Sequence, residues 1–200
     1  MATKTASRNG KAIEVIAIPR IEIAEMEVKL IGDSPLIMHQ WGEKAKAQIR
    51  DKQAKKPKTD NRPKRDPKAE YEASMYRDLD GGYAFPAVAF KAAAVSACRF
   101  NDIQMTIARG AFHVIGELVP ITGEPNMRED MVRVGNGAAD LRYRGEFKDW
   151  STVLTVRYNA AALSAGQLVN LFNIAGFGVG VGEWRPEKNG SYGMFHVEVA

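Results

Sequence analysis

One histidine stands where acid–base chemistry could take place, directly before the most basic part of the chain. The imidazole of His39 could act as a general acid in metal-independent RNA cleavage, or it could stack against a base. An ordinary hydrogen bond within a helix is the alternative for this residue. Asp33 could bind a metal ion for backbone cleavage, but it stands where a helix cap is expected, and capping is the favoured interpretation.

The other motifs exclude several catalytic classes. The three histidines are scattered and the only cysteine is Cys98, so we expect neither a zinc site nor an intramolecular disulfide. The glycine run that ends at Gly182 lacks the Lys-Ser/Thr of a phosphate-binding loop, and it follows an expected helix rather than a strand. No Gly-x-Ser-x-Gly elbow occurs. We therefore expect no metal and no cofactor, and His39 is the one catalytic alternative.

Positive charge is concentrated between Lys44 and Lys68. This segment has eleven Lys/Arg and three acidic residues, a net charge of +8, which leaves 17 basic and 21 acidic residues, or −4, for the rest. Such a basic arm meets nucleic acid or stays solvated. The residues expected to bind nucleic acid here are His39, Trp41, Lys44, Lys46, Arg50, Lys52, Lys55, Lys56, Arg62, Lys64 and Arg65.

Three glycines near the C-terminus, Gly178, Gly180 and Gly182, occupy alternate positions before Trp184 and Arg185. In an extended segment this spacing leaves one face bare, so that another element or a phosphodiester chain can approach the backbone. The glycines alone fit packing at least as well as ligand binding. The tryptophan and arginine favour a ligand because they offer a stacking ring and a phosphate donor, although Trp184 could instead close the edge of the core.

A third candidate contact combines aromatic and basic residues in an expected hairpin. Arg142, Tyr143 and Arg144 alternate in character, so both arginines could share one exposed face of a strand. A solvated strand without a ligand is the alternative.

The elements that must position these residues follow from hydrophobic periodicity and helix signals. Their order is strand, helix, strand, strand, helix, strand, which predicts an α+β, ferredoxin-like (RRM-like) fold with an antiparallel sheet. Two helices would cover one face of this sheet and leave the other for a partner or for the insertions. The expected elements are strands 21–31, 111–121, 152–158 and 193–199 and helices 86–99 and 164–175.

We expect a single ferredoxin-like domain over residues 1–200 with two insertions. Its core comprises 21–31, 86–121 and 152–199; a basic helical arm occupies 32–85, and a hairpin insertion occupies 122–150.

Several local features are also predicted. A bulge is expected near Ala24-Glu25, and a helix should start at Pro35 with Asp33 or Ser34 as its cap. A second helix should start at Asp66-Pro67 and present Tyr71, Met75 and Leu79, and Gly176 should end the helix that begins with the Ser164/Gln167 capping box.

Three of these stretches resemble the RAMP superfamily of CRISPR effector proteins, whose backbone subunits polymerise along a guide RNA. They are Leu30-Ile-Gly-Asp-Ser-Pro-Leu36, Phe85-Pro-Ala-Val-Ala-Phe-Lys-Ala-Ala93 and the glycine-rich loop Gly176–Gly193. They occur in the order of that family. The resemblance implies a ferredoxin-like fold and RNA binding. The chain also looks like uncharacterised proteins encoded by phages and prophages.

These observations lead to one expected function and two alternatives. We expect a protein that binds single-stranded RNA or DNA through the backbone with low sequence preference and self-assembles along the strand as a homo-oligomer or filament. The alternatives are an endoribonuclease that uses His39 and an assembly protein whose arm grips a neighbouring subunit. No apolar run is long enough for a membrane span, so we expect a cytoplasmic protein, in a bacterial host cell if it is phage-encoded.

Overall fold

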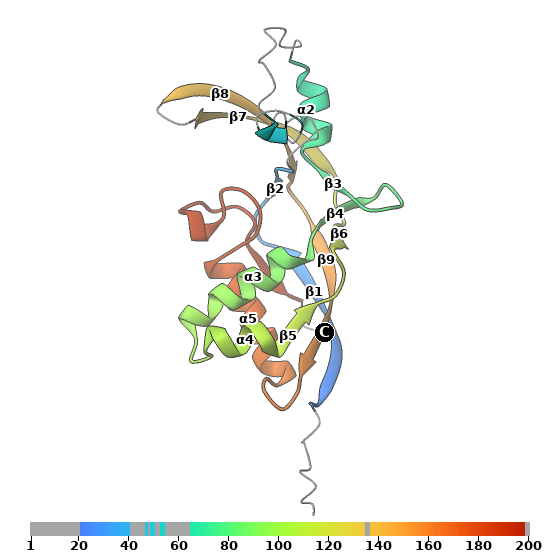
Figure 1. Cartoon of the computed structure of the whole chain (residues 1–200), viewed down its shortest axis with the longest axis vertical. Coiled ribbons are helices and arrows are strands. Elements are labelled where there is room, and N and C mark those ends of the chain that lie inside the picture. Colours follow the sequence, from blue (N-terminus) through green and yellow to red (C-terminus); the bar gives the residue numbers. More distant parts are fainter. Residues whose placement is uncertain are drawn as a thin grey trace, which may run out of the picture.

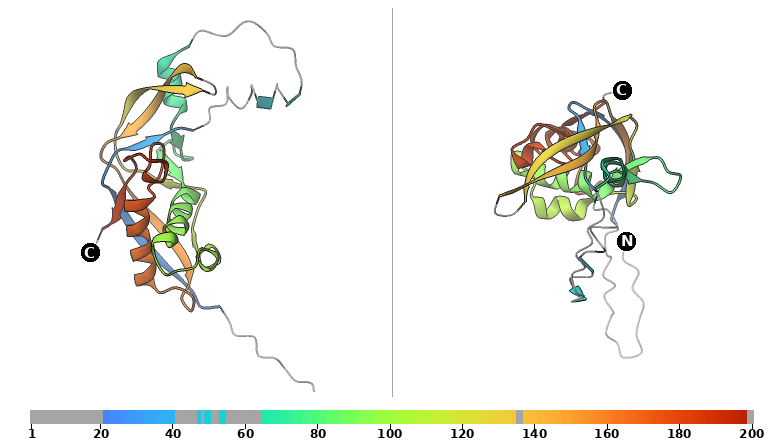
Figure 2. Two further views of the ribbon diagram at one scale, coloured as in Figure 1. Left: turned by 90° about the vertical axis from the view of Figure 1, so that its left-hand side faces the viewer. Right: turned by 90° about the horizontal axis from the view of Figure 1, so that it is seen from above.

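The chain is an α+β protein with antiparallel sheets (Figure 1). A computed structural model describes residues 21–40, 47, 49–50, 53–54, 65–134 and 137–198. Seen from the side, these residues form an arc, with a long hairpin and a short helix at one end and the larger helices at the other (Figure 2). Three sheets are present in this part of the chain, and the largest has four strands.

The four-stranded sheet is built around the paired strands β1 and β9. Residues alternate along both strands: Val28 and Leu30 are buried while Glu27 and Lys29 are exposed. Pairing is unbroken from Ile23 opposite Asn159 to Ile31 opposite Ser151, so the predicted bulge near Ala24-Glu25 is wrong. The strand order is β10 (Phe195–Val197), β1 (Ile23–Gly32), β9 (Ser151–Asn159) and β5 (Phe112–Val114), and every neighbouring pair is antiparallel.

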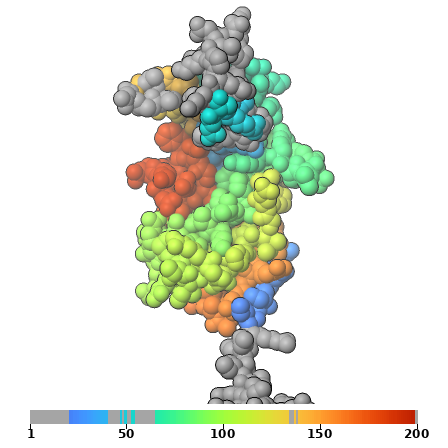
Figure 3. Space-filling view, in the orientation of Figure 1, coloured from blue at the N-terminus to red at the C-terminus, as the bar shows by residue number. Residues whose placement is uncertain are grey.

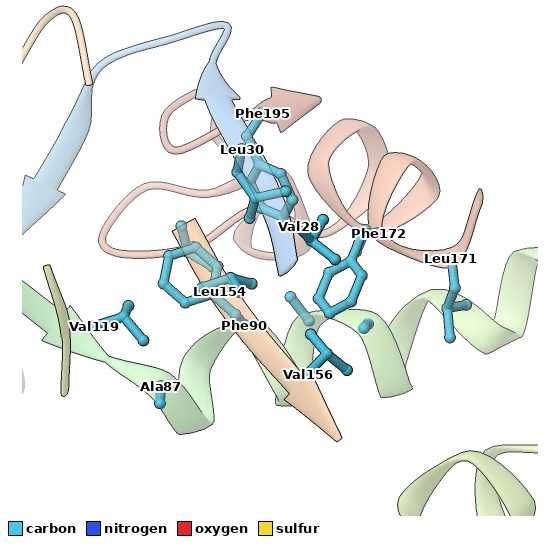
Figure 4. Close-up of a cluster of buried hydrophobic side chains, with 14 of the residues drawn as sticks. Val28, Leu30, Ala87, Phe90, Val119, Leu154, Val156, Leu171, Phe172 and Phe195 are labelled. Carbon is cyan, nitrogen blue, oxygen red and sulfur yellow. The ribbon is translucent and has the colours of Figure 1, made fainter. Parts of the chain in front are cut away.

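Helices α3 (Ala87–Ala97) and α5 (Ala165–Gly178) cover one face of this sheet. Figure 4 shows Phe90 and Phe172 from the helices beside Leu154 and Val156 from β9. These side chains are completely buried, and removing one such ring would cost about 3–5 kcal/mol.

The start of α5 is fixed by the predicted capping box. Ser164 Oγ accepts the backbone N–H of Gln167 at 3.2 Å, and Gln167 Oε1 accepts the Ser164 N–H at 2.9 Å. The sequence predicts that this helix ends at Gly176, but it continues to Gly178. Gly176 serves packing instead, because a Cβ there would lie 1.7 Å from the Phe195 carbonyl oxygen of β10.

Two three-stranded sheets extend the molecule beyond this core. A hairpin lies within the predicted insertion 122–150, and the helix α2 (Pro67–Ala73) packs against its second strand. One sheet contains β2 (Leu36–Met38), β8 (Ala138–Phe147) and β7 (Pro125–Val134), and the other contains β3 (Tyr76–Arg77), β4 (Tyr83–Pro86) and β6 (Leu118–Pro120). The remaining elements are α2 (Pro67–Ala73), α4 (Met105–Ala111) and the 3₁₀ turns η1 (Cys98–Phe100) and η2 (Pro186–Lys188).

The predicted helix at Pro35 is a strand. Leu36, Ile37 and Met38 are fully buried and pair with β8, so tertiary burial overrides the local start signal. Asp33 does not cap a helix; its carboxylate lies 2.6 Å from Nδ1 of His196. Ser34 Oγ accepts the backbone N–H of Met194.

The predicted strand 111–121 is two strands in different sheets. Gly116 adopts φ +96° and separates β5 from β6, so the chain leaves the four-stranded sheet at this point. The helix predicted from Asp66 is confirmed with Asp66 as its cap, but it ends at Ala73. Met75 then enters the core and Leu79 lies fully exposed in a turn, so these two residues do not share a helix face.

Candidate nucleic-acid interface

Both ends of the basic arm join the body at α2 and β8. On one side, the Gln40 N–H donates to the Ser74 carbonyl at 2.7 Å. On the other, the Arg65 guanidinium contacts Glu70 and Asp140 and donates to the Leu141 carbonyl. The arm therefore leaves and re-enters the body close to the hairpin. Of the predicted arm contacts, the following lie outside the described residues: Trp41, Lys44, Lys46, Lys52, Lys55, Lys56, Arg62 and Lys64.

His39 lies just before the arm and faces a carboxylate of the glycine-rich loop. It follows β2 and is not in a helix. Its Nδ1 lies 3.7 Å from Glu183 Oε1, and Arg144 Nη2 lies 4.0 Å from Glu183 Oε2. The neighbouring His39 imidazole and, more weakly, the charge of Arg144 hold the pKa of Glu183 below its ordinary value, against the opposing effect of burial.

The predicted basic stretch of the hairpin has a different arrangement from the one expected. Arg144 is buried rather than exposed, and its Nη1 pairs with Asp130 at 3.2 Å. Its Nε is the one buried side-chain nitrogen or oxygen in the described part of the chain without a hydrogen-bond partner. Arg142 is half-buried and pairs with Asp140, while Tyr143 contacts Glu129. The expectation that both arginines share an exposed face is therefore wrong.

The glycines of the C-terminal loop are approached by protein. Gly178 is helical, and Gly180 and Gly182 have φ values of +68° and +78°. The expectation of an extended segment is therefore wrong. A Cβ on Gly180 would lie 2.7 Å from Pro186 Cδ, and one on Gly182 would lie 2.6 Å from the Ile37 carbonyl oxygen. These contacts favour the packing alternative for both residues.

Trp184 and Arg185 follow these glycines on the surface. Trp184 is 43% exposed and has a φ of +56°, so its ring is not buried at the core edge. Arg185 pairs with Glu187, and the same carboxylate accepts from Arg99 at 2.9 Å. Burial would raise the pKa of Glu187, but the Arg185 hydrogen bond and the two guanidinium charges lower it overall.

A pocket of about 270 Å³ lies between α3 and this loop. Its lining includes Ala89, Ala92 and Ala93 from α3, together with His39 and Glu183. In the space-filling view the red surface of the loop adjoins the green surface of α3 (Figure 3). The pocket therefore begins at the base of the arm and continues toward the C-terminal end of α3, where Ser96 and Glu187 line it.

The exposed face of the four-stranded sheet offers little to a nucleic acid. Its outward side chains include both charge signs, and Arg157 is paired with Glu25. None of the outward-facing described residues on these four strands is Phe, Tyr or Trp, and the two imidazoles there have protein partners: His113 lies 3.0 Å from Lys91 and His196 lies 2.6 Å from Asp33. The outward-facing residues are Ile23, Glu25, Glu27, Lys29, Ile31, His113, Ser151, Val153, Thr155, Arg157, Asn159 and His196.

Carboxylates offset most of the arginine charge of the body. Of the ten arginines from residue 65 onward, Arg109 and Arg133 have no ion pair with a described carboxylate, and eight have a carboxylate within 4.0 Å: Arg65, Arg77, Arg99, Arg128, Arg142, Arg144, Arg157 and Arg185. The segment 41–64, in contrast, contains nine Lys/Arg and three acidic residues, a net charge of +6. The excess positive charge of the molecule thus belongs to the arm.

Two functional features were not predicted from the sequence. Glu183 approaches Arg144 and Glu187 pairs with Arg99, and no local pattern indicates these long-range pairs. Phe100 and Phe177 are 60% and 76% exposed. A helical projection of α5 places Phe177 opposite the buried stripe of Leu168 and Phe172, so its exposure follows from the sequence, but its nearness to Phe100 does not.

Among the described residues, no group of three His, Cys, Asp or Glu side chains is placed to hold a metal ion. Within the same part of the chain, none of the helices has the length and apolar character needed to cross a membrane.

No protein-family model and no curated sequence matches the chain. Among solved structures, Cmr6 from Pyrococcus furiosus is similar, with 10% sequence identity and a TM-score of 0.47. The match covers 90% of this chain and 100% of that one. At this level of similarity, inferences about function depend on the residues of the chain itself.

Proposed function

We propose that the protein binds single-stranded nucleic acid through the phosphate backbone, with its basic arm as the principal contact. The supporting observation is the contrast in charge: eight of the ten arginines from residue 65 onward are paired with carboxylates, whereas residues 41–64 of the arm have a net charge of +6. Neutralising phosphates with lysine and arginine releases counterions and gives affinity without sequence preference.

The body would hold the strand where the arm begins. The pocket mouth carries His39 and lies beside the exposed Trp184, so a strand leaving the arm would meet groups that hydrogen-bond or stack with bases. Arg142, Arg144 and Arg185 would serve chiefly to hold the hairpin and loop in place, because their carboxylate partners reduce their attraction for phosphate.

We infer a ferredoxin-like core for the same protein. Numbered along the chain, the four strands of the main sheet have the order 4-1-3-2, and a helix follows the first and third of them. This order supports the likeness to RAMP proteins that the three sequence stretches indicate, and with it the proposal of a protein that assembles along a single strand.

Cleavage by His39 is the second candidate function. The pairing of His39 with Glu183 at the mouth of a pocket favours it, because a carboxylate can orient an imidazole for proton transfer. We favour binding over catalysis, since among the described residues no second histidine, nor any lysine, lines this pocket.

The proposal is tested by binding a labelled single strand. The wild-type protein is purified without nuclease, its absorbance ratio is recorded, and binding to DNA and RNA strands of equal length is measured. We expect copurifying nucleic acid and binding to several unrelated sequences. A protein that binds neither strand but changes its oligomeric state when lysines of the arm are replaced would support subunit assembly instead.

A further inference from the structure

Two exposed phenylalanines lie together where α3 and α5 end. Phe100 is 60% exposed at the end of η1, and Phe177 is 76% exposed in the last turn of α5. A Cβ on Gly178 would lie 3.3 Å from Cε2 of Phe100, so this ring rests directly on the backbone next to Phe177. We call these two rings the aromatic ledge.

The aromatic ledge adjoins the pocket and carries positive charge. The Arg99 guanidinium lies 5.7 Å from the centre of the Phe100 ring and donates to Glu187, which lines the pocket. Arg185 shares that same carboxylate, so two guanidiniums face one anionic group and a net charge of +1 remains. A ring surface beside excess positive charge suits an anionic ligand with flat apolar faces.

We infer that the aromatic ledge stacks a base of the bound single strand, an inference that rests on the proposed function. The arm would supply the phosphate contacts. The bound strand would then pass the pocket, and the aromatic ledge would stack a base on the side of the pocket away from the arm. Base–aromatic stacking tolerates any base because every base has a flat face, in keeping with low sequence preference. The absence of a side chain at Gly178 leaves room for the Phe100 ring against the end of α5, where its free face is open to a base.

The test compares two strands of equal length, one with thymine bases and one abasic, on four proteins. These are the wild type, Phe100→Ala, Phe177→Ala and Leu79→Ala; Leu79 is a fully exposed apolar residue in the turn between β3 and β4. We expect each phenylalanine variant to bind the thymine strand about 5- to 150-fold more weakly and the abasic strand unchanged. Leu79→Ala should match the wild type on both strands.

The other outcomes separate the ledge from the proposed function. Unchanged affinity of both phenylalanine variants for the thymine strand, or equal losses on both strands, would overturn the ledge while leaving the arm model intact. Loss of self-association with normal strand binding would identify the ledge as a contact between copies. Failure of the wild type to bind either strand would remove the proposed function, and the ledge with it. If Phe100→Ala melts early, Phe177→Ala decides, because its ring is the more exposed.

Discussion

Nδ1 of His39 lies 3.7 Å from Oε1 of Glu183, so the histidine at the base of the basic arm has a carboxylate neighbour from the opposite end of the chain. This relationship joins three parts of the molecule, because Arg144 of the hairpin approaches the same carboxylate at 4.0 Å. At 3.7 Å the first contact is an electrostatic pair rather than a hydrogen bond.

The first prediction concerns His39→Ala. The binding model predicts that the wild type does not cleave RNA. It also predicts that the variant loses at most roughly 1–3 kcal/mol of binding free energy, the contribution of one stacked ring. An enzyme would lose most of its rate, since a general acid contributes about 10²–10⁴-fold. Gel analysis of a labelled RNA and of a DNA of the same sequence decides between the two. Cleavage of the RNA that disappears in His39→Ala would establish the enzyme.

The second prediction is a pH dependence of stability that originates at Glu183. Its pKa is lowered in the folded protein by His39 and by the Arg144 and Arg185 charges, so its ionised form stabilises the fold. That contribution is fully present above its ordinary pKa of 4.5 and is lost as pH falls through the lower folded value. Melting temperatures from pH 7 to pH 3 should therefore show wild type and Glu183→Gln converging on acidification. Glu27→Gln, an exposed site on β1, is the control, and an equal gap at all pH values for Glu183→Gln would contradict the assignment.

The third prediction concerns the buried guanidinium of the hairpin. Arg144→Ala should lower the free energy of unfolding by about 3 kcal/mol, since it removes a buried side chain that pairs with Asp130 and approaches Glu183, and leaves its space empty. Arg144→Met should cost less, because it fills that space; in both variants Asp130 keeps Arg128 at 2.8 Å. Urea denaturation measures both, and the exposed Arg157→Ala should change stability by at most about 1 kcal/mol. Equal effects at positions 144 and 157 would contradict the burial of Arg144.

The fourth prediction uses two glycines of one helix. Gly176→Ala should be strongly destabilising, because its Cβ would lie 1.7 Å from the Phe195 carbonyl oxygen and would force β10 away. Gly166→Ala, in the first turn of the same helix, meets nothing within 4 Å and should stabilise the protein by about 0.5–1 kcal/mol. Thermal melting should shift in opposite directions for the two variants. A shift in the same direction would mean that α5 and β10 pack differently.

Sequence reasoning worked where a residue's role depends on its neighbours along the chain. The alternating burial of β9, the Ser164 capping box and the hairpin of β7 and β8 are local patterns and were predicted. It failed where the conformation of a residue depends on partners that are distant in the sequence. Leu36, Ile37 and Met38 became a strand because β8 was available to pair with them, and Gly176 stayed helical because β10 packs against it.

The candidate site shows the same division. The basic arm is visible as a run of charges, whereas the approach of Glu183 to Arg144 and the pairing of Glu187 with Arg99 join residues that no spacing rule connects. A cluster of arginines in sequence is therefore a weak guide to phosphate contact until its carboxylate partners are known. The arm remains the part of the prediction that rests on sequence alone.

The most direct test of the account is the salt dependence of single-strand binding. If about six cations of the arm meet phosphates, a plot of log affinity against log salt should have a slope of roughly −4. Replacing six arm lysines (44, 46, 52, 55, 56 and 64) with glutamine should reduce the slope to about −2 or shallower, since Arg50, Lys58 and Arg62 remain, whereas replacing Arg157 and Lys29 on the sheet should leave it unchanged. A flat response in the wild type, or an unchanged slope in the arm variant, would contradict the central claim that the arm grips the strand.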